Sequence, residues 1–147
     1  MDHNKRQEID VVVLTIQKIL QNLNLAPEDL KYGYYEWKVS RGSATIILSY
    51  IPSQGFVCAE SILVACPEPM PSEMISFLLR ENHQTHGFTL SIRDEKVILS
   101  LLIYDLYLHE KATPKKLNEL FDLADHYDNI LVEQFGAQWI ETSKSLT

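Results

Sequence analysis

The chain has 147 residues, 46% of them hydrophobic, which is the size of one domain with a buried core. It carries 13 basic and 20 acidic residues, a net charge of -7, which argues against a protein that binds nucleic acid. No apolar run approaches the ~20 residues that span a bilayer, and the polar start MDHNKRQEID lacks a signal peptide's apolar segment. We therefore expect a single cytoplasmic domain over residues 1–147, without membrane contact, that frays from Glu141 to Thr147.

The first predicted element is a helix from Lys5 to Asn24, because apolar residues recur there at spacings of three and four. Asn24 and the following Pro27 mark its end. Val11 and Leu14 fall beside the main apolar stripe and widen it. The stripe itself consists of Ile9, Val12, Val13, Ile16, Ile19, Leu20 and Leu23.

Three strands are predicted next, over residues 34–40, 44–51 and 56–65. In the first of them Tyr35 and Trp37 alternate with charged residues, which is the period of a strand with one solvated face. The connections are too short for the crossovers that parallel strands need. The sequence therefore predicts an antiparallel meander.

A second helix follows, from Pro71 to His86, and a hairpin comes after it, with strands over residues 88–92 and 97–108. The turn type at Asp94-Glu95 stays open, because neither residue is the glycine that favours a tight hairpin turn. The helix residues expected to point inward are Met74, Ile75, Leu78 and Leu79.

The strand over residues 97–108 is apolar on both faces, with Val97 and Leu99 in one register and Ile98 and Leu102 in the other. An antiparallel strand with one solvated face alternates apolar and polar residues, so both sides of this one need a cover. Helices supply one cover. For the other we expect a second copy of the chain, because symmetric dimers are the commonest assemblies. The alternative is that the first helix covers that face within one chain.

The closing helix has the clearest pattern. Thr113 is expected to cap its start, with Pro114 in the first turn, and Gly136 to end it in a left-handed conformation. Its apolar stripe consists of Leu117, Leu120, Phe121, Ala124, Tyr127, Leu131 and Phe135.

The element order is therefore α-β-β-β-α-β-β-α, an α+β domain whose antiparallel five-stranded sheet is packed by helices. In this order, and in the stretches FLLRENHQTHGFTLSIRDEKVILSLL and LNELFDLADHYDNILVEQFG, the chain resembles the type III secretion chaperone-like fold. It resembles in particular the YbjN-type sensory transduction regulator domains. The resemblance implies a homodimeric, non-enzymatic protein that binds other polypeptides, and it implies no catalytic residues. The residues at the pattern's positions in the last helix are Ala124, Asp125, Tyr127, Asp128, Phe135 and Gly136.

Residues with reactive side chains form no recognisable catalytic or metal-binding set. Cys58 and Cys66 lie on or just after one strand, too far apart in an extended chain for a disulfide, and are expected to be free thiols. His83 and His86 have a spacing that lets them share a helix face, but a structural zinc site needs four ligands and only Glu81 lies near them. The glycine-rich phosphate motifs are absent. We therefore expect no catalytic residue, no metal and no cofactor.

The functional hypothesis is a protein that binds a polypeptide, by strand addition to the first strand or by groove contacts. Aromatic residues are enriched at binding hot spots, although Tyr35 and Trp37 fit an ordinary core equally well. The rival classes are a small uncharacterised enzyme and a purely structural dimeric subunit. The residues predicted for partner binding or dimerisation are Tyr35, Trp37, Leu102, Tyr104, Leu106 and Tyr107.

Overall fold

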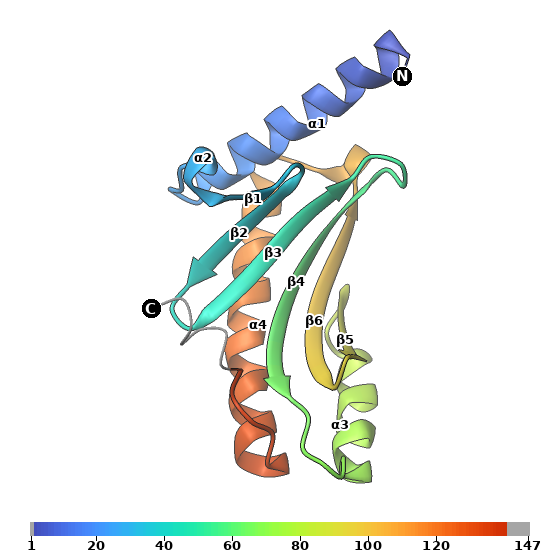
Figure 1. Ribbon diagram of the computed structural model, residues 1–147, viewed down its shortest axis with the longest axis vertical. Coiled ribbons are helices and arrows are strands. Elements are labelled where there is room, and N and C mark those ends of the chain that lie inside the picture. Colours follow the sequence, from blue (N-terminus) through green and yellow to red (C-terminus); the bar gives the residue numbers. More distant parts are fainter. Residues whose placement is uncertain (1, 141–147) are drawn as a thin grey trace.

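The computed structural model describes residues 2–140, which form an α+β domain with one antiparallel sheet (Figure 1). Within these residues the sheet has six strands, in the order β1-β2-β3-β4-β6-β5. The longest helix, α4, runs along one face of the sheet, α1 crosses one end of the molecule, and α3 packs beside β5. The predicted fraying of residues 141–147 lies outside the described residues. In chain order the elements are α1 (His3–Asn22), α2 (Pro27–Leu30), β1 (Lys31–Gly33), β2 (Glu36–Arg41), β3 (Ala44–Ile51), β4 (Phe56–Ala65), α3 (Ser72–Asn82), β5 (Phe88–Arg93), β6 (Lys96–Tyr104), the 3-10 turn η1 (Asp105–Tyr107) and α4 (Ala112–Phe135).

The prediction of five strands was wrong, because the short strand β1 precedes the first predicted one. It pairs with β2 at only two positions, Lys31 opposite Trp37 and Gly33 opposite Glu36. Residues 34 and 35, which the sequence placed in a strand, form the turn between β1 and β2. A strand of three residues is too short to show the alternation that identifies longer strands.

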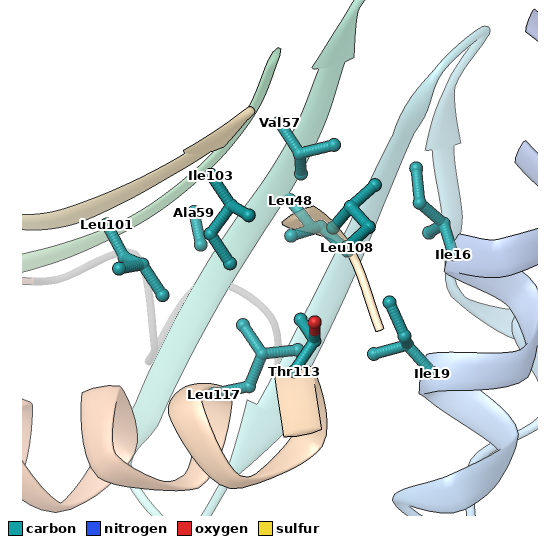
Figure 2. Close-up of a pocket in the computed structure, with 10 residues that line it drawn as sticks. All are labelled: Ile16, Ile19, Leu48, Val57, Ala59, Leu101, Ile103, Leu108, Thr113 and Leu117. Carbon is teal, nitrogen blue, oxygen red and sulfur yellow. The ribbon is translucent and has the colours of Figure 1, made fainter. Parts of the chain in front are cut away.

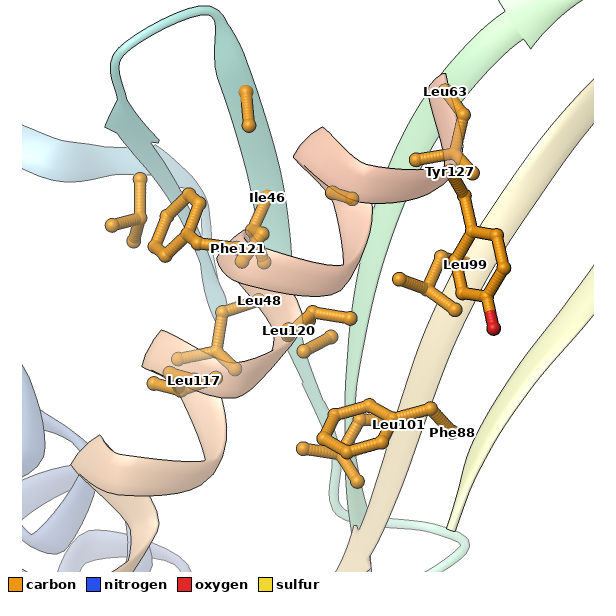
Figure 3. Packing of buried hydrophobic residues seen from close by; sticks show 14 of the residues in the cluster. Ile46, Leu48, Leu63, Phe88, Leu99, Leu101, Leu117, Leu120, Phe121 and Tyr127 are labelled. Carbon is orange, nitrogen blue, oxygen red and sulfur yellow. The ribbon is translucent and has the colours of Figure 1, made fainter. Parts of the chain in front are cut away.

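The hydrophobic core lies between α4 and the sheet. Leu117 and Leu120 of α4 are buried against Leu48 of β3 and Leu99 and Leu101 of β6 (Figure 3). Burying one such side chain contributes ~1.5–3 kcal/mol to stability, so this stripe accounts for much of the fold's hydrophobic stabilisation. The sequence predicted this stripe correctly.

The two ends of α4 are held by different devices. At the start, Nδ1 of His109 accepts hydrogen bonds from the backbone N–H groups of Lys111 and Ala112, each at 3.1 Å. The hydroxyl of Thr113 does not cap the helix as predicted but accepts from the backbone N–H of His109 at 2.9 Å. At the other end, Gly136 has φ 73°, the left-handed cap that the sequence predicted.

α1 lies on the same side of the sheet as α4. Its residues Ile16 and Ile19 face Leu117 of α4 and Leu48 of β3 around an apolar cavity of about 10 Å³ (Figure 2). A cavity needs ~10–15 Å³ of such space to hold a single water molecule, and this one is lined almost entirely by apolar side chains, so it is a packing gap and not a ligand site. The alternative in which α1 covers the opposite face of the sheet is therefore wrong.

The hairpin of β5 and β6 closes through a two-residue turn in which Asp94 has φ 52° and Glu95 has φ 61°. Two successive positive φ values are the signature of a type I′ turn, which answers the question that the sequence left open. β6 ends at Tyr104, earlier than predicted, and η1 follows it.

The interior face of α3 is narrower than the sequence predicted. Met74 and Leu78 are buried as expected, whereas Ile75 and Leu79 are exposed. Phe77 packs edge-on against Tyr127 of α4, with ring centroids 6.3 Å apart. Because α3 covers the rim of the sheet and not its centre, only this stripe finds partners.

Candidate functional site

The sheet face turned away from α4, which we call the outer face, has apolar side chains that no helix covers. Alternation along β4 and β6 turns Val57, Ala59 and Leu101 toward α4 and the intervening residues outward. The strand register places the outward residues side by side, Cys58 opposite Leu102 and Phe56 opposite Tyr104. The apolar members of the outer face are Ile47, Ile51, Phe56, Cys58, Ile62, Ile98, Leu102 and Tyr104.

Four of the six predicted binding residues lie at this surface or continue from it. Leu102 is 47% exposed and Tyr104 is 55% exposed on β6, and the ring of Tyr104 meets that of Phe56 edge-on at 6.4 Å. Leu106 and Tyr107 follow in η1 and are even more exposed. These residues therefore remain accessible to a partner in the isolated chain.

Trp37 is only 1% exposed and belongs to the core, which is one of the two interpretations that the sequence left open. Its register partner on β3 is Leu48, and both side chains point to the face that α4 covers. Tyr35 is half-buried in the turn before β2, where its ring lies 4.5 Å from that of Tyr34 and 5.6 Å from that of Tyr50. The predicted aromatic surface over Tyr35 and Trp37 is therefore not formed.

Several exposed apolar residues were not among those predicted for binding. Tyr32 and Tyr34 are exposed at β1 and the turn after it. Val11 and Leu14 are exposed on α1, on the side opposite to its buried stripe. The sequence did indicate that α1 has exposed apolar residues, because a helix that is apolar over more than half of its circumference has more apolar surface than one sheet can cover.

The two cysteines do not form a reactive site. Both are free and half-buried, and burial raises the pKa of each thiol. For Cys58 the pKa rises to about 11, because burial and the nearby Glu60 carboxylate both disfavour the thiolate. Since the thiolate is the reactive form, a redox role has no support here.

The other polar groups take structural roles. A surface hollow of about 340 Å³ lies between the end of α3, β5 and α4, and Tyr127 closes one side of it by donating to Glu81 at 3.2 Å. His109 caps α4, and the ring of His126 packs on Tyr127 at 5.0 Å. Within residues 2–140, no group of three or more His, Cys, Asp or Glu side chains is arranged to hold a metal ion. Over the same residues, no helix is both long and apolar enough to cross a membrane.

Comparison with known proteins finds similarity in structure only. No family model matches the chain, and no curated protein sequence matches it. A chain of the HopA1–SchA chaperone–effector complex superposes with a TM-score of 0.66 at 9% identity, covering 88% of this chain and 98% of that one. A chain of the heterodimeric ExoU–SpcU complex, from the type III secretion system of Pseudomonas aeruginosa, superposes with a TM-score of 0.62 at 17% identity, covering 82% and 97%. The Yersinia pestis type III secretion chaperone SycH, solved with a fragment of YscM2, gives a TM-score of 0.61 at 14% identity, covering 78% and 98%.

These similarities define the class of fold. The chain has the type III secretion chaperone-like fold over nearly the whole length of the matched chains, as the sequence resemblance predicted. At sequence identities of 9–17%, the similarity shows a shared fold and does not by itself show a shared function. The more specific resemblance to YbjN-type domains stays a prediction.

Proposed function

We propose that this chain is a non-enzymatic, cytoplasmic protein of the chaperone-like class, which works as a homodimer and holds a segment of a client protein. The outer face carries this proposal, because it leaves Leu102 and Tyr104 half-exposed beside further apolar residues. Apolar patches of this kind on a soluble domain mark interaction sites. The solved structures with the same fold include a chaperone–effector complex and a secretion chaperone bound to a protein fragment, which supports a protein as the partner.

The outer face is assigned to the second copy of the chain. An interface between identical copies uses the same patch on both sides, so a group of exposed apolar side chains on a sheet face is suited to it. Arg93 and Glu60 form an ion pair at 2.8 Å on this face. Glu60 lies on β4 between Cys58 and Ile62, so the ion pair divides the apolar residues into two groups. Leu102 lies between that ion pair and Tyr104 and is expected to be central to the interface.

The client segment is assigned to the β1–β2 edge of the sheet. β1 accompanies β2 only as far as Trp37, so among the described residues no strand lies beside the last part of β2, up to Arg41. Such an edge has backbone groups free to pair with an extended peptide. Tyr32 and Tyr34 are exposed next to it and provide the aromatic contacts that a bound segment needs.

The dimer is tested by measuring mass in solution with light scattering. The wild-type protein is expected at twice the chain's 16.9 kDa, and Leu102→Glu at the mass of one chain, because a carboxylate has no partner in an apolar interface. Gln134→Glu on the exposed side of α4 introduces the same charge and is expected to stay dimeric. A wild-type protein that remains monomeric at a chain concentration of about 100 μM contradicts the dimer, because its copies then associate by less than ~5–6 kcal/mol.

The client site is tested separately with Tyr32→Ala/Tyr34→Ala. Affinity capture from the native cell extract identifies bound proteins, and titration with the purified capture product then measures binding. We expect the double variant to bind at least about tenfold more weakly, as for the loss of a hot-spot contact, with unchanged mass and melting temperature. Equal binding by wild type and variant contradicts the assignment to this edge. A dimer that captures no protein at all supports the alternative of a structural subunit.

A further inference from the structure

β5 forms the edge of the sheet opposite to β1, and its outward backbone groups can be identified from the hairpin register. Arg93 pairs with Lys96 across the two-residue turn, so along β5 the residues alternate between bonding to β6 and facing outward. The residues whose backbone N–H and C=O groups point away from β6, toward the open edge, are Phe88, Leu90 and Ile92. An edge strand with such groups free is a ready template for another strand.

At Leu90 a side chain takes the place of the missing strand. The backbone N–H of Leu90 donates to Oδ1 of Asn82 at 2.6 Å, and Nδ2 of Asn82 donates to the carbonyl oxygen of Leu90 at 3.0 Å. In an antiparallel pair, one residue exchanges both of its backbone bonds with a single residue opposite. The amide of Asn82 reproduces that exchange from the end of α3, so Leu90 is already paired.

At Phe88 the backbone groups are bonded by Thr85, which lies between the end of α3 and the start of β5. The hydroxyl of Thr85 donates to the carbonyl oxygen of Phe88 at 2.6 Å, and the backbone N–H of Phe88 lies 3.5 Å from the carbonyl oxygen of Thr85. Thr85 is buried, so this contact is shielded from water. Among the described residues, Ile92 is the outward-facing position of β5 without such a partner.

We infer that Asn82 and Thr85 lock the β5 edge against strand addition, and that a second copy of this chain pairs with β5 when the lock is removed. A second β5 is the occupant that fits, because two identical edges pair antiparallel about a two-fold axis through Leu90. The free position at Ile92 and the exposed Leu79 of the neighbouring α3 extend that apolar edge. Because the β5 edge is locked, the β1–β2 edge is the edge of the sheet that can pair with a client segment.

The experiment compares Asn82→Ala and Thr85→Val with the wild-type protein by amide hydrogen exchange and by light scattering over a range of concentrations. In dilute Asn82→Ala we expect the Leu90 amide to exchange about tenfold faster, the factor that corresponds to the loss of one hydrogen bond. On raising the concentration we expect the mass to increase beyond that of the wild type and the Leu90 amide to become protected again. Thr85→Val, which keeps the side-chain shape, is expected to show a smaller change in the same direction.

Leu78→Ala is the matched control, because Leu78 is buried in α3 but has no bond to the β5 edge. It destabilises α3 without opening the strand. Association of Leu78→Ala to the same extent as Asn82→Ala overturns the inference, since loss of stability alone then explains it. A wild-type rate of Leu90 exchange in Asn82→Ala, or a mass equal to that of wild type at all concentrations in both lock variants, overturns it as well.

Discussion

The hydroxyl of Tyr127 donates a hydrogen bond to Oε1 of Glu81 at 3.2 Å and so joins α4 to α3. Burial and the carboxylate together raise the pKa of Tyr127 to about 12. Tyr127→Phe keeps the ring packing with Phe77 and removes only this bond. We expect the free energy of unfolding to fall by about 1 kcal/mol, measured by urea denaturation. Tyr104→Phe is the control, because the described residues give its hydroxyl no partner, and an equal loss there contradicts the role of the bond.

The sequence predicted the elements whose signal is a long period and missed those that depend on context. The stripe of α4 was correct because seven apolar residues at helical spacing have one interpretation. β1 was missed because a strand of three residues is too short to show an alternation of apolar and polar side chains. Ile75 and Leu79 were predicted to point inward because they are apolar and fall near the helical stripe, but the sequence pattern does not show which part of a helix another element covers. The exposed state of Leu102 and Tyr104 was predictable, since both faces of β6 are apolar and one chain has helices for only one.

The burial of Trp37 could not be predicted from the alternation of residues along its own strand. Alternation correctly placed Trp37 and Val39 on one side of β2, but whether that side faces α4 depends on the register with β3, where Leu48 is the partner of Trp37. For its substitution we therefore expect a loss of stability and not a loss of client binding. Trp37→Ala is expected to lower the free energy of unfolding by ~3–5 kcal/mol, as for other large aromatic residues in a core.

The measurement for Trp37→Ala is a denaturant titration beside a client-binding titration. Binding per folded molecule is expected to remain, because the ring does not reach the surface. Retained stability with lost binding would show that the ring moves outward to meet the client. Tyr34→Ala gives the comparison, since that ring is exposed and its removal is expected to change stability by less than about 0.5 kcal/mol.

His109 has a structural role that sequence reasoning did not identify. Its Nδ1 accepts from two backbone N–H groups at the start of α4, which otherwise have no acceptor within the helix. His109→Ala is expected to lower the free energy of unfolding by about 1 kcal/mol, as for other side chains that accept from the first backbone N–H groups of a helix. His109→Asn restores an acceptor on a short side chain and is expected to recover part of the loss. Thermal melts of both variants check this, and equal losses count against capping.

Asp128 has a buried carboxyl whose ionised form the fold stabilises only in part, through a backbone hydrogen bond at Asn129. It is 7% exposed, and its Oδ1 has no hydrogen-bond partner within the described residues. Burial, and then the neighbouring Asp125, raise the pKa of this carboxyl to about 6. In the unfolded chain it has the ordinary value of 3.8. Below the unfolded pKa the carboxyl is protonated in both states, so it does not oppose folding.

As pH rises through the folded pKa, this protonated carboxyl must ionise inside the protein, and stability is lost. We therefore expect the contribution of Asp128 to the free energy of unfolding to decrease by roughly 1–3 kcal/mol between pH 4 and pH 7. Asp128→Asn is neutral throughout and is expected to remove that part of the pH dependence, measured by urea denaturation at several pH values. Asp125→Asn removes the neighbouring negative charge and is expected to move the change to lower pH. The same pH dependence in wild type and Asp128→Asn would falsify this account, because another group must then be the one that titrates.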